Sequence, residues 1–233
     1  MFLSFAILTG LSISGVRDIN PSIWEGRVAA GQSLEIKNTY GSIHAEPALG
    51  EQAEVSVEPP DLRVIITQDE HGITFQAVPA GEPDREVRAD FTVRVPRGVR
   101  FVGRTVNGSV HVDSLRGDAA AYTVNGDVRI SAAGETQAET VNGSITASLG
   151  RMCPGHNLKF SSVNGGITLH VHKQLSAKLR VTTLNGGIVS EFPISLQRRG
   201  TGGSAEVTLG RGGSELKLVT VNGTIKLRRT TGV

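Results

Sequence analysis

One short phrase recurs six times in this chain, and it constrains the fold more than any other feature. Thr-Val-Asn-Gly occurs four times, and Ser-Val-Asn-Gly and Thr-Leu-Asn-Gly occur once each. Successive Asn residues are 17 to 22 positions apart, except for a last gap of 37 that is close to two ordinary gaps. A repeat near this period is typical of similar units that stack on one another. The repeated pairs are Asn107 and Gly108, Asn125 and Gly126, Asn142 and Gly143, Asn164 and Gly165, Asn185 and Gly186, and Asn222 and Gly223.

The residues around each Asn alternate in character. The third residue after Asn is always Val or Ile, and the fourth is mostly polar. This alternation predicts a strand with one face in a core and the other in water. We expect Asn-Gly to form a turn, because these residues tolerate positive φ at low cost. We also expect the aliphatic residue just before Asn to face the core and the Thr before it to stack in a ladder.

Two architectures fit this pattern. Asn-Gly between alternating strands is a strong hairpin signal, which would give an antiparallel meander. Alternatively, each repeat is one coil of a β-solenoid, and each strand pairs with its counterpart one coil away. The uniform columns favour the solenoid, because only there does like stack on like, and Asn ladders stabilise stacked strands. The sequence therefore predicts an all-β, single-domain β-solenoid of about seven to eight two-strand coils, with an N-terminal β region.

The ends of the array can also be assigned from the sequence. The double-length gap before Asn222 predicts a coil without the motif, which turns at Thr201–Ser204. Arg228 and Arg229 are expected at the C-terminal edge, where charge discourages pairing with another chain. Residues 24–96 are expected to cover the other end of the array.

The chain divides into five expected segments. Residues 1–15 are an apolar export signal that lacks a basic n-region, too short to span a membrane, and residues 16–23 are a linker. Residues 24–98 form the N-terminal β region, which has a polar hairpin loop between residues 63 and 78 and a degenerate coil with Tyr40 in the Asn place. Residues 99–229 are the repeat array, and residues 230–233 are a tail. These features predict an exported protein of the periplasm or cell surface.

Charge is distributed unevenly along the chain. Residues 1–100 carry 9 basic and 14 acidic side chains, a balance of −5, whereas residues 151–233 carry 12 and 3, a balance of +9. A basic half attracts polyanions. We expect an anionic glycan or envelope polymer, or another envelope protein, as the partner, and no nucleic acid. The candidate polyanion contacts are Arg198, Arg199, Arg211, Lys226, Arg228 and Arg229, supported by Lys173, Lys178, Arg180 and Lys217.

Two small groups of residues suggest metal or nucleophile chemistry. His170 and His172 alternate on one strand and could hold a metal with a third ligand, but no matching ligand is identifiable beside them. Cys153 is near His156 in sequence, yet a nucleophile also needs an oriented base. We therefore predict neither a metal, nor a cofactor, nor a catalytic residue.

The carboxylates give a similar result. Glycan-cleaving sites need acids that converge on one face, usually with stacking aromatics. Asp113, Asp118 and Asp127 occupy different columns of the repeat, and the chain has one Trp and two Tyr. These counts argue against an enzyme.

The repeated phrase resembles a family. Together with its flanks, Phe91–Val102 and the Gly-rich stretch 210–213 that leads into Leu216–Gly223, the phrase is similar to the bacterial putative-adhesin family called domain of unknown function 4097. The resemblance covers Trp24 to Arg229. It implies a β-solenoid, export to the cell surface or periplasm and no established enzyme activity, and it transfers no binding residue. The short leader and Tyr40 depart from the family pattern.

Three functions follow as hypotheses. The first is an exported, non-catalytic structural or adhesin-like module that binds an anionic envelope polymer through its basic C-terminal coils. The second is a periplasmic scaffold or regulatory module that contacts another protein or a second copy. The third is a polysaccharide-active enzyme.

Overall fold

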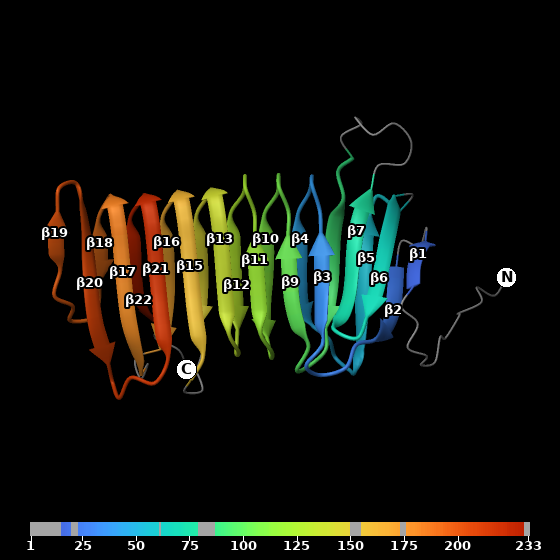
Figure 1. The fold of residues 1–233 in the computed structure, drawn as a ribbon, viewed down its shortest axis with the longest axis horizontal. Coiled ribbons are helices and arrows are strands. Elements are labelled where there is room, and N and C mark those ends of the chain that lie inside the picture. The colour runs from blue at the N-terminus through green and yellow to red at the C-terminus, as the bar shows by residue number, and fades with distance from the viewer. Residues whose placement is uncertain are drawn as a thin grey trace.

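The computed structural model describes residues 15–19, 23–60, 62–78, 87–149, 155–172 and 176–230. Strands and short connections make up these residues, and no helix occurs among them. Two large sheets of 12 and 10 strands lie face to face, with the buried side chains between them (Figure 1). The chain is therefore all-β, as the alternating pattern predicts. Residues 1–14 of the expected signal segment, together with Cys153 and Lys173, lie outside the described residues.

The first sheet has the strand order β1-β6-β7-β3-β9-β11-β13-β15-β21-β17-β20-β19. Its strands are β1 (Gly15–Ile19), β6 (Arg63–Asp69), β7 (Gly72–Val78), β3 (Ser33–Lys37), β9 (Arg100–Arg104), β11 (Ala119–Tyr122), β13 (Thr136–Asn142), β15 (Asn157–Asn164), β21 (Glu215–Asn222), β17 (Ala177–Asn185), β20 (Gly202–Leu209) and β19 (Gln197–Arg199).

The second sheet has the order β18-β22-β16-β14-β12-β10-β4-β8-β5-β2. Its strands are β18 (Ile188–Ser190), β22 (Ile225–Thr230), β16 (Ile167–His172), β14 (Ile145–Leu149), β12 (Val128–Ala132), β10 (Val110–Leu115), β4 (Ile43–Pro47), β8 (Asp90–Val95), β5 (Gln52–Glu58) and β2 (Ile23–Arg27).

Within the repeat region, equivalent strands of different repeats pair in parallel and in register. Asn142 on β13 is opposite Asn164 on β15, and Ile145 on β14 is opposite Ile167 on β16. An Asn-Gly hairpin would instead pair the two strands of one repeat antiparallel. The observed parallel pairing is consistent with stacked repeats. We call two consecutive strands that lie in opposite sheets, such as β13 and β14, a strand pair.

The spatial order of the strand pairs differs from their order in the sequence. The pair β21–β22 lies between β15–β16 and β17–β18 (Figure 1). The pair β7–β8 likewise lies outside β3–β4, farther from the repeats. β22 is therefore not an edge strand over Ile225–Leu227, which pair with both β16 and β18, whereas Arg228 and Arg229 extend past the last paired residue of β18 and pair with β16 alone.

The stretch expected to hide a seventh repeat forms a different structure. β20 pairs antiparallel with β17, and β19 pairs antiparallel with β20, so these strands fold back over the end of the first sheet. Gly200 and Thr201 form the turn between β19 and β20. Of the turn expected at Thr201–Ser204, only Thr201 lies in a turn, because Gly202 to Ser204 belong to β20. This turn joins antiparallel strands at an edge instead of closing another parallel strand pair.

The core is formed by alternate side chains of both sheets. In the second sheet, the third residue after each Asn is fully buried in five repeats and half-buried at Ile188. In the first sheet, the Thr or Ser two positions before Asn is buried in all six. The aliphatic residue next to Asn consequently points outward, and its expected place in the core is wrong. The exposed members of that column are Val106, Val124, Val141, Val163 and Leu184.

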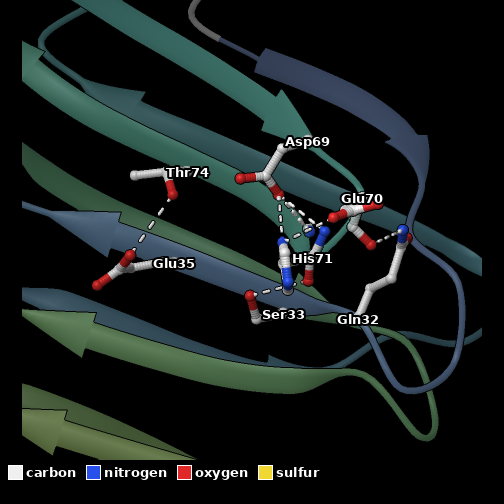
Figure 2. A network of polar contacts seen from close by, with 8 residues as sticks. Gln32, Ser33, Glu35, Asp69, Glu70, His71 and Thr74 are labelled. Atoms are coloured by element: carbon white, nitrogen blue, oxygen red, sulfur yellow. Dashed lines mark hydrogen bonds and ion pairs between the residues drawn. The ribbon is translucent and has the colours of Figure 1, made fainter. Parts of the chain in front are cut away.

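The N-terminal region adds antiparallel strands at the other end. β6 and β7 form the hairpin predicted from residues 63 to 78, and β1 pairs with β6 within the stretch expected to be a linker. Figure 2 shows how the hairpin loop is held. The Asp69 carboxylate accepts hydrogen bonds from the backbone N–H groups of His71 and Gly72, at 2.8 and 3.0 Å, and Ser33 Oγ donates to the His71 carbonyl at 3.2 Å.

Candidate functional site

The Asn side chains form one continuous row of hydrogen bonds along an edge of the molecule. In each step, Nδ2 of one Asn donates to Oδ1 of the Asn on the neighbouring strand, at 2.8 or 2.9 Å. The spatial order is 107, 125, 142, 164, 222 and 185. At the last step, Thr201 Oγ1 donates to Asn185 Oδ1 at 2.7 Å. The β19–β20 turn thus supplies a hydroxyl that continues the row beyond its last Asn.

The Thr and Ser hydroxyls join neighbouring repeats in a second way. Thr140 Oγ1 donates to the Gly126 carbonyl at 2.9 Å, and Thr220 Oγ1 donates to the Gly165 carbonyl at 2.8 Å. The equivalent bonds of Thr105, Thr123, Ser162 and Thr183 have the same form. A buried hydroxyl is tolerated when it has a partner. These bonds explain why the polar Thr column, and not the neighbouring Val column, faces inward.

The repeated Gly is required by close packing of the turns. A Cβ on Gly143 would overlap the carbonyl oxygen of Gly126, and one on Gly165 would overlap that of Gly143. Of the six repeated Gly residues, only Gly186 has a positive φ. We expected Gly here for its tolerance of positive φ. At the other five positions Gly is required instead because the backbones of neighbouring turns are in close contact. Asn, Thr and Gly of the phrase therefore all contribute to contacts between neighbouring strand pairs.

The candidate basic residues are divided between the outer faces of the two sheets. Lys226 and Arg228 alternate on β22 in the second sheet. Arg228 donates to Glu191 at 2.8 Å, and the Arg229 N–H donates to the same carboxylate at 2.8 Å. These hydrogen bonds, from the Arg229 backbone first and then from Arg228, lower the pKa of Glu191 below its ordinary value. One acid thus already neutralises part of this surface, whereas Lys226 is exposed.

A second set of cations lies on the first sheet. Lys159 on β15, Lys217 on β21 and Arg180 on β17 are aligned on three adjacent strands. Arg180 is 3.1 Å from Glu206, and Lys159 is 2.6 Å from Glu139. The structure thus adds Lys159 to the sequence-derived set. Lys178 is exposed on β17, two residues from Arg180. Arg211 is exposed in the β20–β21 turn, and Arg198 and Arg199 are on β19.

Lys159 and Glu139 influence each other electrostatically. Partial burial alone would raise the pKa of Glu139, but hydrogen bonds from Lys159 and Gln137 outweigh it and lower that pKa. The same hydrogen bond raises the pKa of Lys159. Both side chains are therefore held charged at neutral pH.

A polar groove lies on the outer face of the first sheet. Its volume is about 390 Å³. It crosses the adjacent strands β9, β11, β13, β15 and β21, so its long direction runs across the strands of the sheet. β11 contributes Ala119 to the lining, and its side chain is buried. The lining residues are Arg100, Ala119, Glu135, Thr136, Gln137, Asn157, Leu158, Lys159, Glu215 and Lys217.

The groove has a cation near each end. Arg100 lies on β9 at one end, and Lys217 lies on β21 at the other. Neither has a carboxylate within 4 Å among those that the structure places. The carboxylates of Glu135 and Glu215 and the amides of Gln137 and Asn157 lie between or beside them. Sequence reasoning missed this groove, because its residues come from five strands and share no motif.

The candidate acids do not converge. Asp118 precedes β11 and accepts a hydrogen bond from the Glu135 N–H at 2.8 Å, whereas Asp127 follows β11 and accepts one from the Ser144 N–H at 2.7 Å. Asp113 lies 3.5 Å from His44 on the second sheet. Asp118 and Asp127 thus hold connections at opposite ends of one strand.

The two candidate histidines lie on one strand of the second sheet. His170 and His172 share the outer face of β16, and His170 is opposite Arg228. Across the residues that the structure places, no three His, Cys, Asp or Glu side chains are grouped in a way that could hold a metal ion. A search of the same residues finds no helix with the length and apolarity needed to cross a membrane.

Comparison with known proteins shows similarity at the level of the fold. No family model and no curated protein matches the chain. Among solved structures, a putative cell adhesion protein from Clostridium sporogenes is similar over 90% of this chain and 100% of its own, with a TM-score of 0.53 and 10% identity. A putative adhesin from Bacteroides fragilis matches 94% of this chain and 100% of its own, with a TM-score of 0.37 and 12% identity. At 10% identity, the first match shows a shared fold.

Proposed function

We propose that this chain is an exported, non-catalytic, adhesin-like module of the bacterial envelope that binds an anionic polymer. We further propose that it belongs to the domain of unknown function 4097 family and that its parallel strand pairs form a β-solenoid. The sixfold Thr-Val-Asn-Gly phrase supports the family assignment, and the in-register parallel pairing supports the solenoid. The adhesion-related names of the structurally similar proteins support an adhesive role and export.

The observation that carries the binding proposal is the row formed by Lys159, Lys217 and Arg180. Neighbouring strands are about 4.8 Å apart, so the row sets three cations at close and regular intervals on the outer face. Lys159 and Arg180 also contact Glu139 and Glu206, so Lys217 between them is the member of the row with the most charge to offer a ligand. A rigid array of this kind attracts a polymer whose negative charges also repeat. The exposed Lys226 on the opposite sheet gives the second face a similar but weaker character.

The test is binding to anionic polymers at several salt concentrations. Polygalacturonate and polyphosphate are suitable anionic probes, and dextran is a neutral one. We expect salt-sensitive binding to an anionic probe, and we expect Lys217→Gln, Lys226→Gln and Arg211→Gln in combination to weaken it. Absence of binding to both anionic probes at low salt, or binding that survives the triple variant unchanged, would show the proposal to be wrong.

One observation favours a scaffold role as a second candidate function. Val106, Val124, Val141 and Val163 are between 38% and 39% exposed, and Leu184 is 63% exposed, in one column beside the Asn row. Aligned apolar side chains at the surface are a common feature of protein contacts. Val124→Lys and Val163→Lys should abolish such a contact without unfolding the chain, which co-purification from the native host would detect.

A further inference from the structure

We infer that the groove across β9, β11, β13, β15 and β21 binds a linear, sparsely charged acidic glycan, which lies along the stack and across the strands. This inference rests on the proposed binding of an anionic polymer and names the polymer class and the place where it binds. Three features of the groove support it, namely the direction of the groove, the spacing of its cations and the mixture of its polar groups.

The direction and length of the groove suit a chain-like ligand. The five strands that line it are consecutive in the sheet. Four spacings of about 4.8 Å separate the first from the last, so the lined length is roughly 19 Å. Sugars repeat along an extended glycan at a distance close to the strand spacing. Each strand can therefore offer its side chains to a successive sugar.

The positions of the cations indicate where the acidic groups of the ligand lie. Arg100 stands at the β9 end, and Lys217 stands at the β21 end beside Lys159. Lys159 already contacts Glu139, which leaves Arg100 and Lys217 as the cations available to a ligand. Charge-assisted hydrogen bonds to carboxylate groups are among the stronger polar contacts. Two acidic sugars, one toward each end, satisfy both cations.

The groups between the cations exclude a densely charged polymer. Glu135 and Glu215 would repel phosphate or sulfate groups on every unit, but their carboxylates accept hydrogen bonds from sugar hydroxyls. Gln137 and Asn157 can both donate to and accept from hydroxyls. Gln137 keeps part of this capacity, because only its Nε2 donates to Glu139, at 2.9 Å. The groove therefore matches hydroxyl groups in the middle and acidic groups at the ends.

The experiment measures binding of a graded series of oligogalacturonates to the full chain by isothermal titration calorimetry. Affinity is expected to rise with oligomer length until the oligomer reaches from Arg100 to Lys217, and then to level off. Arg100→Gln should weaken binding of the long oligomers by roughly three- to tenfold, as expected for loss of one partly exposed charge contact. Asn157→Trp, which fills the groove without changing its charge, should weaken it at least as much.

Matched controls carry the same changes on the opposite sheet. Arg129→Gln removes one charge from the exposed face of β12, and Thr146→Trp adds the same bulk on β14. Neither should alter oligogalacturonate binding. Thermal unfolding midpoints of all four variants show whether a loss of binding merely reflects unfolding.

The remaining outcomes separate this inference from the broader function. If the wild-type chain binds oligogalacturonates but Arg100→Gln and Asn157→Trp bind like the wild type, the groove is not the site and the inference is wrong. If the chain binds polyphosphate but no oligogalacturonate, the ligand class is wrong while polyanion binding remains. If it binds neither, both this inference and the proposed function are overturned.

Discussion

At the scale of single residues, each position of the repeated phrase has a distinct physical role. Thr donates its hydroxyl to a Gly carbonyl on the next strand pair, Asn continues the side-chain row, and Gly permits close contact between turns. Val lies on the outside, where it supports the extended backbone through its β-branched shape. The polar residue is therefore inside and the apolar one outside, because the buried hydroxyl has a partner.

This inversion predicts a large loss of stability for one substitution and almost none for its neighbour. Thr140→Val keeps the size of the side chain but leaves the Gly126 carbonyl without its hydroxyl donor, so it should reduce the free energy of unfolding by about 1–3 kcal/mol. Val141→Thr alters an exposed side chain and should change it by less than about 0.5 kcal/mol. Urea unfolding of both variants checks this. A larger loss for Val141→Thr would mean that Val141 faces the core.

The Gly column predicts a larger effect. Gly143→Ala brings a methyl group into the Gly126 carbonyl, and both partners are backbone atoms held by hydrogen bonds to neighbouring strands. Overpacking of this kind reduces the free energy of unfolding by about 1–3 kcal/mol or more. Because the surrounding backbone cannot move easily, we expect a loss at the upper end of this range. Gly50→Ala is the matched control, because a Cβ there has no atom within 4 Å. Equal stability of the two variants, measured by thermal unfolding, would contradict the close contact.

At the scale of elements, the last strands of the chain occupy an interior position. β21 hydrogen bonds to β15 and β17, and β22 hydrogen bonds to β16 and β18. The antiparallel strands β19 and β20, which precede them in sequence, instead lie at the end of the first sheet. Chain termini usually fray, but these strands have a neighbour on each side.

Hydrogen exchange should reveal this placement. We expect the amides of Ile225–Leu227 in β22 to be as well protected as those of β16 and better protected than those of β18 and β19, because this part of β22 is paired on both sides whereas β18 and β19 are at sheet edges. Mass spectrometry of exchanged peptides measures the difference. Exchange of β22 as rapid as that of β19 would place the C-terminal strands at an edge.

At the scale of the whole molecule, ion pairs connect neighbouring strands across the outer faces of both sheets. Arg94 on β8 contacts Glu46 on β4 and Glu54 on β5, at 2.9 and 2.8 Å. Near the turns, burial alone would raise the pKa of Asp90, but hydrogen bonds from Arg88 and from the Ser42 N–H outweigh it and lower that pKa. Asp90, Glu139 and Glu191 therefore all have lowered pKa values.

These lowered pKa values predict a loss of stability in acid. A carboxyl whose pKa is lower in the folded state stabilises the fold above its unfolded pKa, which is about 4, and this contribution disappears as pH falls through the folded pKa. The free energy of unfolding should thus be level from neutral pH to about 5 and should decline below about 4. Glu139→Gln should reduce the decline measured by urea unfolding, and Glu51→Gln, at an exposed loop position, should leave it unchanged. A decline that Glu139→Gln leaves unaltered would exclude a contribution from Glu139.

Much of the fold could be predicted from the sequence, because the same local pattern of residues recurs along the chain. The period near 20 and the alternation after each Asn indicate an all-β chain, and all-β is what the structure has. The residue facing the core could not be predicted, since Thr-Val alternation is compatible with either face until the partner of the hydroxyl is known. The groove could not be predicted either, because Arg100, Asn157 and Lys217 are distant in sequence and become neighbours only through strand pairing.

The repeating unit, its strands and the positions of its turns follow from the sequence alone, because they depend on local alternation and on the residue types that turns accept. The spatial order of the strand pairs, in contrast, is a property of the tertiary structure. Every repeat presents nearly the same Asn, Gly and aliphatic columns, so any two can pair in register, and the motif does not specify a neighbour. The antiparallel return of β19 and β20 accompanies the placement of β21–β22 inside β17–β18, and that placement brings Lys217 next to Lys159.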